Sequence, residues 1–284
     1  MGWLFCYYNS NMKHPLFEQK PVVIGMVHFS ALEGSDDFRD ADSVLTRARD
    51  DMAALLEGHV DAIMFENNFD TPKYERLPAL QRAHFSKLVR ELAPLCSVPW
   101  GISALWNDYT LGFELCAELG GIMVRVPVFV DDIETTYGSF YAHPQDVVAA
   151  RNRLAPNVLL LTDVHVKHAR MLRPRPFADS VREALQNGTD AIIVTGQWTG
   201  DPPTPDQCDE AKRLANGDAY VLTGSGMTAE NMSSFTPYID GCIVGTAFKE
   251  GDINLKKRSG PNIVKADRRY SLDRIKEFMS AVRG

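Results

Sequence analysis

The sequence predicts a closed (β/α)8 TIM barrel, in which parallel strands alternate with covering helices. Three observations carry this prediction. Short apolar runs of strand length recur along the whole 284 residues, amphipathic stretches of helical length separate most of them, and no linker or change in composition divides the chain. Barrels of this kind often reach such a length as one domain. We therefore expect one barrel from residue 21 to 284, preceded by a loosely packed N-terminal leader, residues 1–20.

The expected strands are continuous apolar runs, as parallel strands buried on both faces are. They cover residues 22–27, 62–65, 99–102, 122–124, 158–161, 191–194, 219–222 and 242–244. Glycines such as Gly58 and Gly188 stand a few residues before several of the runs. This order is typical of a helix that ends at a glycine, a tight turn and then a strand.

The helices are expected where apolar residues recur at helical spacing. Residues 42–56 place Val44, Ala48, Met52 and Leu55 on one face, and residues 80–92 and 110–119 follow the same pattern. Alternating strands and helices imply right-handed units and a parallel sheet. A doubly wound open sheet is the alternative, although no G-x-G-x-x-G motif follows the first strand to favour it.

Composition excludes several classes of protein. With 45% hydrophobic and 24% charged residues the chain is neither disordered nor fibrous. Its net charge of −7, with one dense basic run at residues 256–258, argues against nucleic acid as a partner. No apolar run approaches the length of a membrane span. The cysteines are odd in number and widely spaced, so we expect reduced thiols and a cytoplasmic protein: Cys6, Cys96, Cys116, Cys208 and Cys242.

In a barrel of this type the functional site lies at the carboxyl ends of the strands. The polar residues that follow the apolar runs are therefore the candidate site. In chain order these are His28, Glu66, Asn67, Asn68, Asp70, Ser103, Asn107, Asp108, Arg125, Asp163, His165, Lys167, His168, Thr195 and Gly196, followed by two glycine-bearing turns.

The two glycine-bearing turns predict a phosphate site. Gly224, Ser225 and Gly226 follow the seventh strand, and Gly245 and Thr246 follow the eighth. Glycines let backbone N–H groups converge on an anion, and a helix beginning at such a turn would add its partial positive charge. We expect one helix to begin at Thr228 as its N-cap. Glycines also serve tight turns that bind nothing, which is the alternative.

The stretch Asp163-x-His165-x-Lys167-His168 is the densest ionisable cluster, and three chemistries are open to it. Asp163 and His165 could hold a divalent metal together with Glu66 and His28. Lys167 could form a Schiff base with a carbonyl substrate. Asp163 and His165 could act as a general acid/base pair. In an extended stretch Asp163, His165 and Lys167 would share one face. A solvated loop of mutually paired charges is the structural alternative.

Glu66 ends a run that should be buried, so its carboxylate must be paired, hydrogen-bonded or protonated. Arg125 is the expected partner, or else binds a carboxylate or phosphate of the substrate in two-point fashion. His28 ends the first strand and is either a structural residue or a substrate contact.

These residues lie in segments that resemble the BtpA/SgcQ family, named for a photosystem I biogenesis factor and a sugar-operon protein. The matching segments begin at residues 24–28 and 66–72, include Arg125, and continue through 163–169, 194–200, 224–231 and 244–249. The resemblance implies a TIM barrel close to the phosphate-binding barrels and fixes no reaction. The chain departs from the family pattern at Trp106, where the family has arginine, at Pro127, where it has asparagine, and in residues 29–34, which lack its prolines.

The leading hypothesis is an enzyme, a lyase, isomerase or hydrolase, acting on a sugar phosphate or a nucleotide-derived phosphate, with or without a divalent metal and as a monomer or homo-oligomer. Catalysis is assigned to Glu66, Asp163, His165 and Lys167, with Glu66, Asp163 and His165 as the candidate metal ligands. Substrate binding is assigned to His28, Asn67, Arg125, Thr195, Gly224, Ser225, Gly226, Gly245 and Thr246. The rival hypothesis is a non-catalytic assembly or regulatory factor that retains the barrel and its phosphate pocket.

Overall fold

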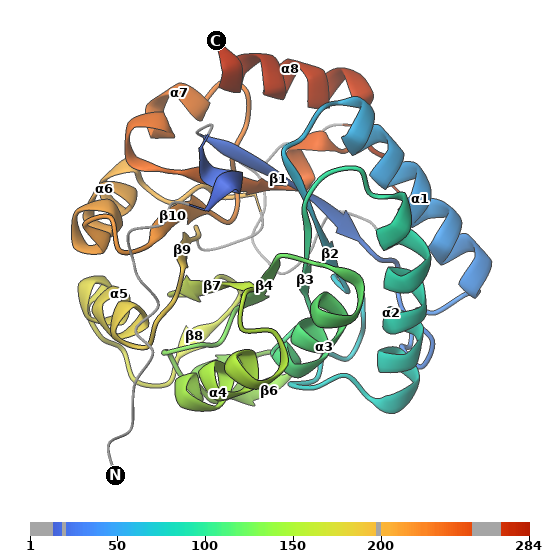
Figure 1. The fold of residues 1–284 in the computed structure, drawn as a ribbon, viewed down its shortest axis with the longest axis horizontal. Helices are drawn as coiled ribbons and strands as arrows, with labels where there is room; N and C mark the ends of the chain where they lie inside the picture. Colours follow the sequence, from blue (N-terminus) through green and yellow to red (C-terminus); the bar gives the residue numbers. More distant parts are fainter. Residues whose placement is uncertain (1–13, 19–20, 197–199, 252–267) are drawn as a thin grey trace.

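The computed structural model describes residues 14–18, 21–196, 200–251 and 268–284. Eight parallel strands form a closed barrel in which the last strand pairs with the first, which confirms the predicted fold (Figure 1). In barrel order the strands are β1 (Val22–His28), β2 (Ala62–Glu66), β3 (Trp100–Ser103), β4 (Met123–Val126), β7 (Leu159–Val164), β9 (Ala191–Val194), β10 (Tyr220–Thr223) and β11 (Gly241–Val244). Each overlaps one of the apolar runs.

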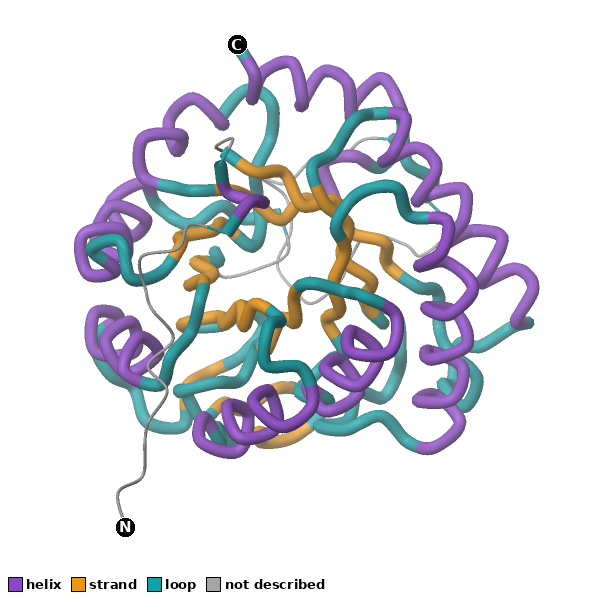
Figure 2. Tube along the Cα trace, viewed as in Figure 1, coloured by secondary structure: helices purple, strands orange, loops and turns teal. Residues whose placement is uncertain are grey.

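Helices surround the strands as an outer ring (Figure 2). They are α1 (Ala41–Glu57), α2 (Ala79–Leu92), α3 (Tyr109–Leu119), α4 (Pro144–Leu154), α5 (Phe177–Gln186), α6 (Pro205–Ala215), α7 (Met232–Phe235) and α8 (Leu272–Arg283). Short 3-10 turns are η1 (Pro15–Phe17), η2 (Ala93–Leu95), η3 (Thr236–Tyr238) and η4 (Thr246–Phe248). None of the helices among these residues is long and apolar enough to cross a bilayer.

Strand alternation decides which side chains reach the barrel interior. Val22, Ile24 and Met26 of β1 belong to the inner core, whereas Val23 and Val27 pack under the helices. The next inward position of β1 is His28, and by the same period-two rule Glu66, Arg125 and Asp163 follow the inner residues of β2, β4 and β7. The top layer of the barrel is therefore polar and charged.

Residues 14–18 of the expected leader pack against the barrel through Phe17. Phe17 is only 1% exposed and stacks on Tyr220 with ring centroids 3.8 Å apart. Its core neighbours include Val22 and Leu159, the first residues of their strands, so Phe17 closes the amino-terminal end of the barrel. The sequence alone could not show this contact, because Phe17 and Tyr220 are about 200 positions apart in the chain. Residues 1–13 and 19–20 of the expected leader lie outside the described residues, as do Cys6 and the basic run 256–258.

A small antiparallel sheet beside the mouth was not expected from the sequence. It consists of β5 (Ile133–Thr135), β6 (Gly138–Phe140) and β8 (Arg170–Met171), in the order β6-β5-β8. Strands this short carry no periodic pattern that could be recognised. Ile133 and Phe140 pack with Trp106 in a separate apolar cluster, so the sheet anchors the loops that follow β3 and β4.

The helix expected to begin at Thr228 begins instead at Met232. The Thr228 N–H donates to Asn231 Oδ1 at 2.9 Å and the Asn231 N–H to Thr228 Oγ1 at 3.3 Å, so these two residues close a turn before the helix. After β11 only the three-residue η4 follows. The prediction of a helix that begins at Thr228 is therefore wrong, and the four-residue α7 and the three-residue η4 are both too short to supply a helix dipole.

Candidate functional site

A pocket of about 1000 Å³, part of it open to solvent, lies over the carboxyl ends of the strands. Its polar lining comes from the ends of β1, β2 and β4 and from the loops that follow β2, β7, β10 and β11. The polar side chains on its wall are His28, Glu66, Asn68, Lys73, Arg125, Lys167, His168, Ser225, Thr246 and Lys249. Most of the expected site is thus brought to one mouth.

Arg125 organises the buried charges at the floor of this pocket. Its Nε and Nη2 each donate to one Asp163 carboxylate oxygen at 2.8 Å, and its Nη1 lies 3.6 Å from Glu66 Oε1. β4 and β7 are neighbours with Arg125 opposite Leu161, which places Asp163 two residues further along on the same inner face. One guanidinium therefore compensates two carboxylates, and these carboxylates keep the pKa of Arg125 above its usual value although burial opposes this.

His28, Glu66 and Ser103 form a row across three adjacent strands, because the strand register places them opposite one another. Ser103 Oγ donates to Glu66 Oε1 at 2.9 Å, and His28 Nε2 lies 3.3 Å from Glu66 Oε2. Burial opposes ionisation of Glu66, but the bond from His28 and the charge of Arg125 outweigh it and lower the pKa of Glu66 to about 2. Burial also lowers the pKa of His28. At neutral pH the pair is an anionic Glu66 beside a neutral histidine.

Three lysines line the pocket in different surroundings. Lys167 Nζ donates to the Gly224 carbonyl at 3.2 Å, and burial together with the nearby Arg125 charge lowers its pKa to about 8. Lys73 Nζ donates to two backbone carbonyls, of Asn67 at 3.3 Å and of Asn68 at 2.8 Å, and burial lowers its pKa to about 8 as well.

The third lysine, Lys249, is 1% exposed and lies against aromatic rings. Its Nζ is 4.8 Å from the ring centroid of Phe69 and 5.9 Å from that of Tyr270. An ammonium group over aromatic faces is stabilised in its charged form.

The pocket therefore carries an excess of positive charge. The charged side chains on its wall are Lys73, Arg125, Lys167, Lys249 and Glu66, and Asp163 lies at the floor against Arg125. Two further carboxylates act from behind this wall, Asp70 on Lys73 and Asp51 on Lys249, so the excess belongs to the wall itself. The protein as a whole, by contrast, has a net charge of −7. Because charges in a partly enclosed site interact more strongly than in water, the arrangement favours an anionic ligand.

Sequence reasoning missed Lys73 and Lys249. Lys249 stands three residues after Thr246. Its closeness in sequence to the end of β11 could therefore have identified it as a candidate site residue. Lys73 reaches the pocket only because the loop after β2 folds back, and its position in the sequence gives no such indication.

The two glycine-bearing turns line the pocket, but the protein's own packing requires their glycines. Gly226 has a φ of +72°, and a Cβ there would lie 2.0 Å from the Pro202 backbone nitrogen. A Cβ on Gly245 would lie 2.5 Å from His28 Cε1. Ser225 Oγ donates to the Asp201 carbonyl at 2.8 Å, so its hydroxyl joins two loops.

The structure does not bring His165 to the pocket wall. β7 ends at Val164 and His165 has a left-handed φ of 50°, so the extended geometry that would align it with Asp163 and Lys167 stops there. The His165 ring packs edge-on against Phe177 at 5.5 Å. The prediction of one shared face is therefore wrong beyond the end of the strand.

Two further expected substrate contacts lie behind the pocket wall. Asn67 Oδ1 accepts the Leu105 N–H at 2.7 Å, and its Nδ2 donates to Asp70 at 2.9 Å, so the amide holds loops together. Thr195 is 6% exposed, and its hydroxyl lies 3.5 Å from the His165 carbonyl.

The residues present do not form a divalent metal centre. Within the described ranges no three His, Cys, Asp or Glu side chains converge as metal ligands would. Glu66 and Asp163 both face the Arg125 guanidinium, and His165 points elsewhere. A cation at this place would have to compete with the buried arginine.

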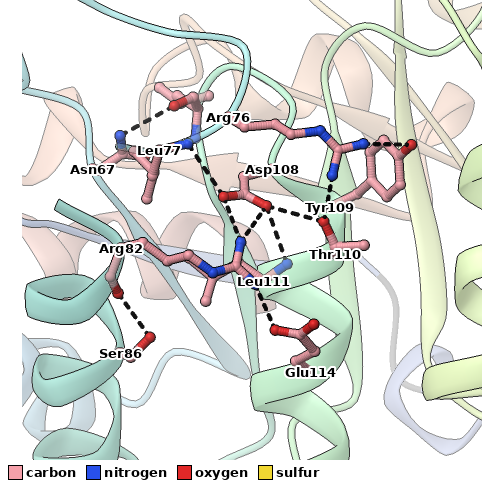
Figure 3. A network of polar contacts seen from close by, with 11 residues as sticks. Asn67, Arg76, Leu77, Arg82, Ser86, Asp108, Tyr109, Thr110, Leu111 and Glu114 are labelled. Carbon is pink, nitrogen blue, oxygen red and sulfur yellow. Dashed lines mark hydrogen bonds and ion pairs between the residues drawn. The ribbon is translucent and has the colours of Figure 1, made fainter. Parts of the chain in front are cut away.

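Asp108 was also collected among the polar residues at the mouth, and its contacts are structural. Figure 3 shows its carboxylate between Arg82 and the backbone of Leu77 and Leu111. Arg82 Nη1 lies 2.8 Å from both carboxylate oxygens, and the Leu111 N–H donation caps α3. Asp108 therefore fixes the loop after β2 to the start of α3, and this loop carries Lys73.

Comparison with known proteins identifies relatives of this chain. The model of the BtpA family matches residues 18–265. The chain is 33% identical to an uncharacterized protein of Pyrococcus furiosus, covering 95% of this chain and 100% of that one. It is 32% identical to the photosystem I biogenesis protein BtpA of Synechocystis, covering 84% of each.

Solved structures share the fold at low sequence identity. Thiamine phosphate pyrophosphorylase from Pyrococcus furiosus has a TM-score of 0.53 at 12% identity, covering 92% of this chain and 95% of that one. N-(5'-phosphoribosyl)anthranilate isomerase from the same organism also has a TM-score of 0.53 at 12% identity, covering 92% and 98%. The fold, the order of the motifs and the sequence identity agree, and the chain belongs to the BtpA family.

Proposed function

We propose that the chain is an enzyme acting on a small phosphorylated metabolite, a sugar phosphate or a nucleotide-derived compound, in the pocket at the mouth of the barrel. The observation that carries the proposal is the excess of positive charge in that pocket. A phosphate group would offset the excess, whereas a neutral ligand would leave it uncompensated.

Lys249 is the best placed phosphate contact. It lies at the end of the segment that begins with Gly245 and Thr246, it lines the pocket, and its Nζ lies over the rings of Phe69 and Tyr270. The backbone of both glycine-bearing turns faces the same pocket. The names of the two related barrels, a thiamine phosphate pyrophosphorylase and a phosphoribosylanthranilate isomerase, support phosphorylated ligands for this fold.

Lys167 is the best placed group for chemistry on the rest of the ligand. Its pKa of about 8 is nearer neutrality than that of Glu66, at about 2, or of His168, at about 3. A group that exchanges a proton near neutral pH is most effective when its pKa is close to that pH. Glu66 and Asp163 then act as fixed negative charges beside the reacting centre.

A second candidate is a non-catalytic assembly factor, because one relative at 32% identity is named a photosystem I biogenesis protein. Such a role needs an apolar docking surface. Among the described residues the exposed large hydrophobic side chains are Tyr74, Leu80, Leu95, Tyr137 and Tyr141, and three of these five are tyrosines, which carry a polar hydroxyl. The charged pocket favours the enzyme.

A thermal-shift panel tests the proposal. Inorganic phosphate, sugar phosphates and nucleotides are compared with their dephosphorylated counterparts, since a ligand that binds only the folded state stabilises it by about 2.7 kcal/mol at a hundredfold excess over Kd. We expect one phosphorylated class to raise the melting temperature and its dephosphorylated counterpart to have little effect. Lys249→Met should reduce the shift, and Lys276→Met, which changes an exposed lysine of α8, should not. No shift with any phosphorylated compound would contradict the proposal.

A further inference from the structure

The three lysines of the pocket are not chemically equivalent. Lys73 Nζ is hydrogen-bonded to two carbonyl oxygens, and Lys249 Nζ lies over two aromatic rings. Carbonyl oxygens and aromatic faces both attract a positive charge. Burial nevertheless lowers the pKa of Lys73 to about 8, as it does for Lys167, so these two lysines differ in their contacts and not in their pKa. To attack an electrophile, Lys73 would have to give up two hydrogen bonds, and Lys249 would have to leave its place over two rings.

Lys167 is held differently. Its Nζ has one carbonyl contact, to Gly224 across the mouth, and within the described residues it forms no ion pair with a carboxylate. The guanidinium of Arg125 is its like-charged neighbour. That guanidinium cannot move away or lose its charge, since Asp163 holds it at two points. A fixed positive neighbour together with burial favours the neutral amine, which is the nucleophilic form.

The surroundings also suit a product that is positively charged at the same atom. The carboxylates of Glu66 and Asp163 lie within electrostatic reach of Lys167 Nζ. An iminium ion formed on this nitrogen would face these fixed negative charges. Open pocket space adjoins Lys167, whose side chain is partly exposed there.

We propose that Lys167 forms a Schiff base with the carbonyl carbon of a phosphorylated aldehyde or ketone. The inference rests on the proposed function for the phosphate group and adds the carbonyl group to the substrate class. Lys249 and the glycine-bearing turns would hold the phosphate at one side of the pocket while the carbonyl carbon meets Lys167.

The step balances without an external reagent. The neutral amine adds to the carbonyl carbon through its nitrogen lone pair, and the carbonyl oxygen takes up the proton that the ammonium form had released. The resulting carbinolamine loses this oxygen as water with a second proton from nitrogen. Overall one ammonium and one carbonyl give one iminium and one water. Adding borohydride then transfers a hydride to the iminium carbon and leaves a stable secondary amine.

The test uses the full chain with dihydroxyacetone phosphate, glyceraldehyde 3-phosphate and glycolaldehyde phosphate, each with sodium borohydride. We expect about one reduced adduct per chain, located at Lys167 by peptide mass spectrometry. Lys167→Arg, which keeps the charge, and Lys167→Met should both lose the adduct, whereas Lys276→Met, which changes an exposed lysine of α8, should keep it. The initial trapping rate should rise with pH between 7 and 9, as the amine loses its proton.

Glycerol 3-phosphate, which has a phosphate but no carbonyl group, separates the two proposals. If it binds by thermal shift while no carbonyl compound is trapped at Lys167, the Schiff base is overturned and the phosphate pocket stands. If neither binding nor trapping occurs, the proposed function fails too. Labelling spread evenly over surface lysines, or unchanged in Lys167→Arg, would also overturn the inference.

Discussion

Arg125 and Asp163 form a two-point ion pair between adjacent barrel strands, with both nitrogen–oxygen distances 2.8 Å. Arg125 is 6% exposed and Asp163 2%. The same guanidinium also faces Glu66, so one residue contacts both carboxylates at the floor of the pocket and adds a positive charge near Lys167. Its position follows from the register of β4 and β7.

Arg125→Met should destabilise the protein by about 3–5 kcal/mol, because it leaves the buried Asp163 carboxylate without its partner. Urea denaturation measures the loss. Arg90→Met is the matched control, since Arg90 makes a similar two-point contact with Glu118 on the surface and should cost less than about 1 kcal/mol. Equal losses in the two variants would show that Arg125 does not hold buried charge.

Lys73→Met should destabilise the protein by about 1–3 kcal/mol, because the carbonyls of Asn67 and Asn68 lose their shared donor. The effect should be local. Hydrogen exchange in the loop after β2 should accelerate, while exchange in β7 and β9 stays as it was. Uniform acceleration across the barrel would contradict the role of Lys73 as a loop contact.

Acid should destabilise the protein partly through His168. Burial and the charges of Lys167 and Lys73 lower its pKa to about 3 from 6.5, although Glu66 opposes this. Between these values the unfolded chain binds the extra proton, so stability falls as pH falls, by up to about 1.4 kcal/mol per pH unit.

His168→Asn should remove this contribution, and asparagine tolerates the left-handed φ of 63° found there. Urea denaturation at pH 7, 6 and 5 should therefore show a shallower loss of stability in the variant than in the wild type. Parallel pH profiles would mean that His168 does not titrate differently on folding.

Phe17→Ala should cost about 3–5 kcal/mol, because it empties the amino-terminal end of the barrel core. Ligand binding at the opposite mouth should be unchanged once the variant is folded. Phe17→Leu, which keeps most of the apolar volume, should cost clearly less. A stability equal to that of the wild type in Phe17→Ala would place this segment outside the core.

The sequence was sufficient to predict every barrel strand, because parallel strands buried on both faces are continuous apolar runs. It also predicted that His28, Glu66, Arg125 and Asp163 lie at one mouth, since each follows an apolar run at the carboxyl end of its strand. It could not predict where the His165 side chain points, because this depends on the left-handed φ of His165 itself, the first residue after β7. Nor did it identify Lys73 or the core position of Phe17, because both depend on how a loop or terminal segment folds back in space.

Calorimetric titration of inorganic phosphate into wild type, Lys249→Met and Lys276→Met tests the central claim, that the charge of the pocket binds phosphate. We expect saturable binding of one phosphate per chain, weakened roughly tenfold in Lys249→Met, as loss of a charged contact implies. Lys276→Met should bind as the wild type does. Absence of saturable binding in the wild type, or equal affinity in all three proteins, would contradict it.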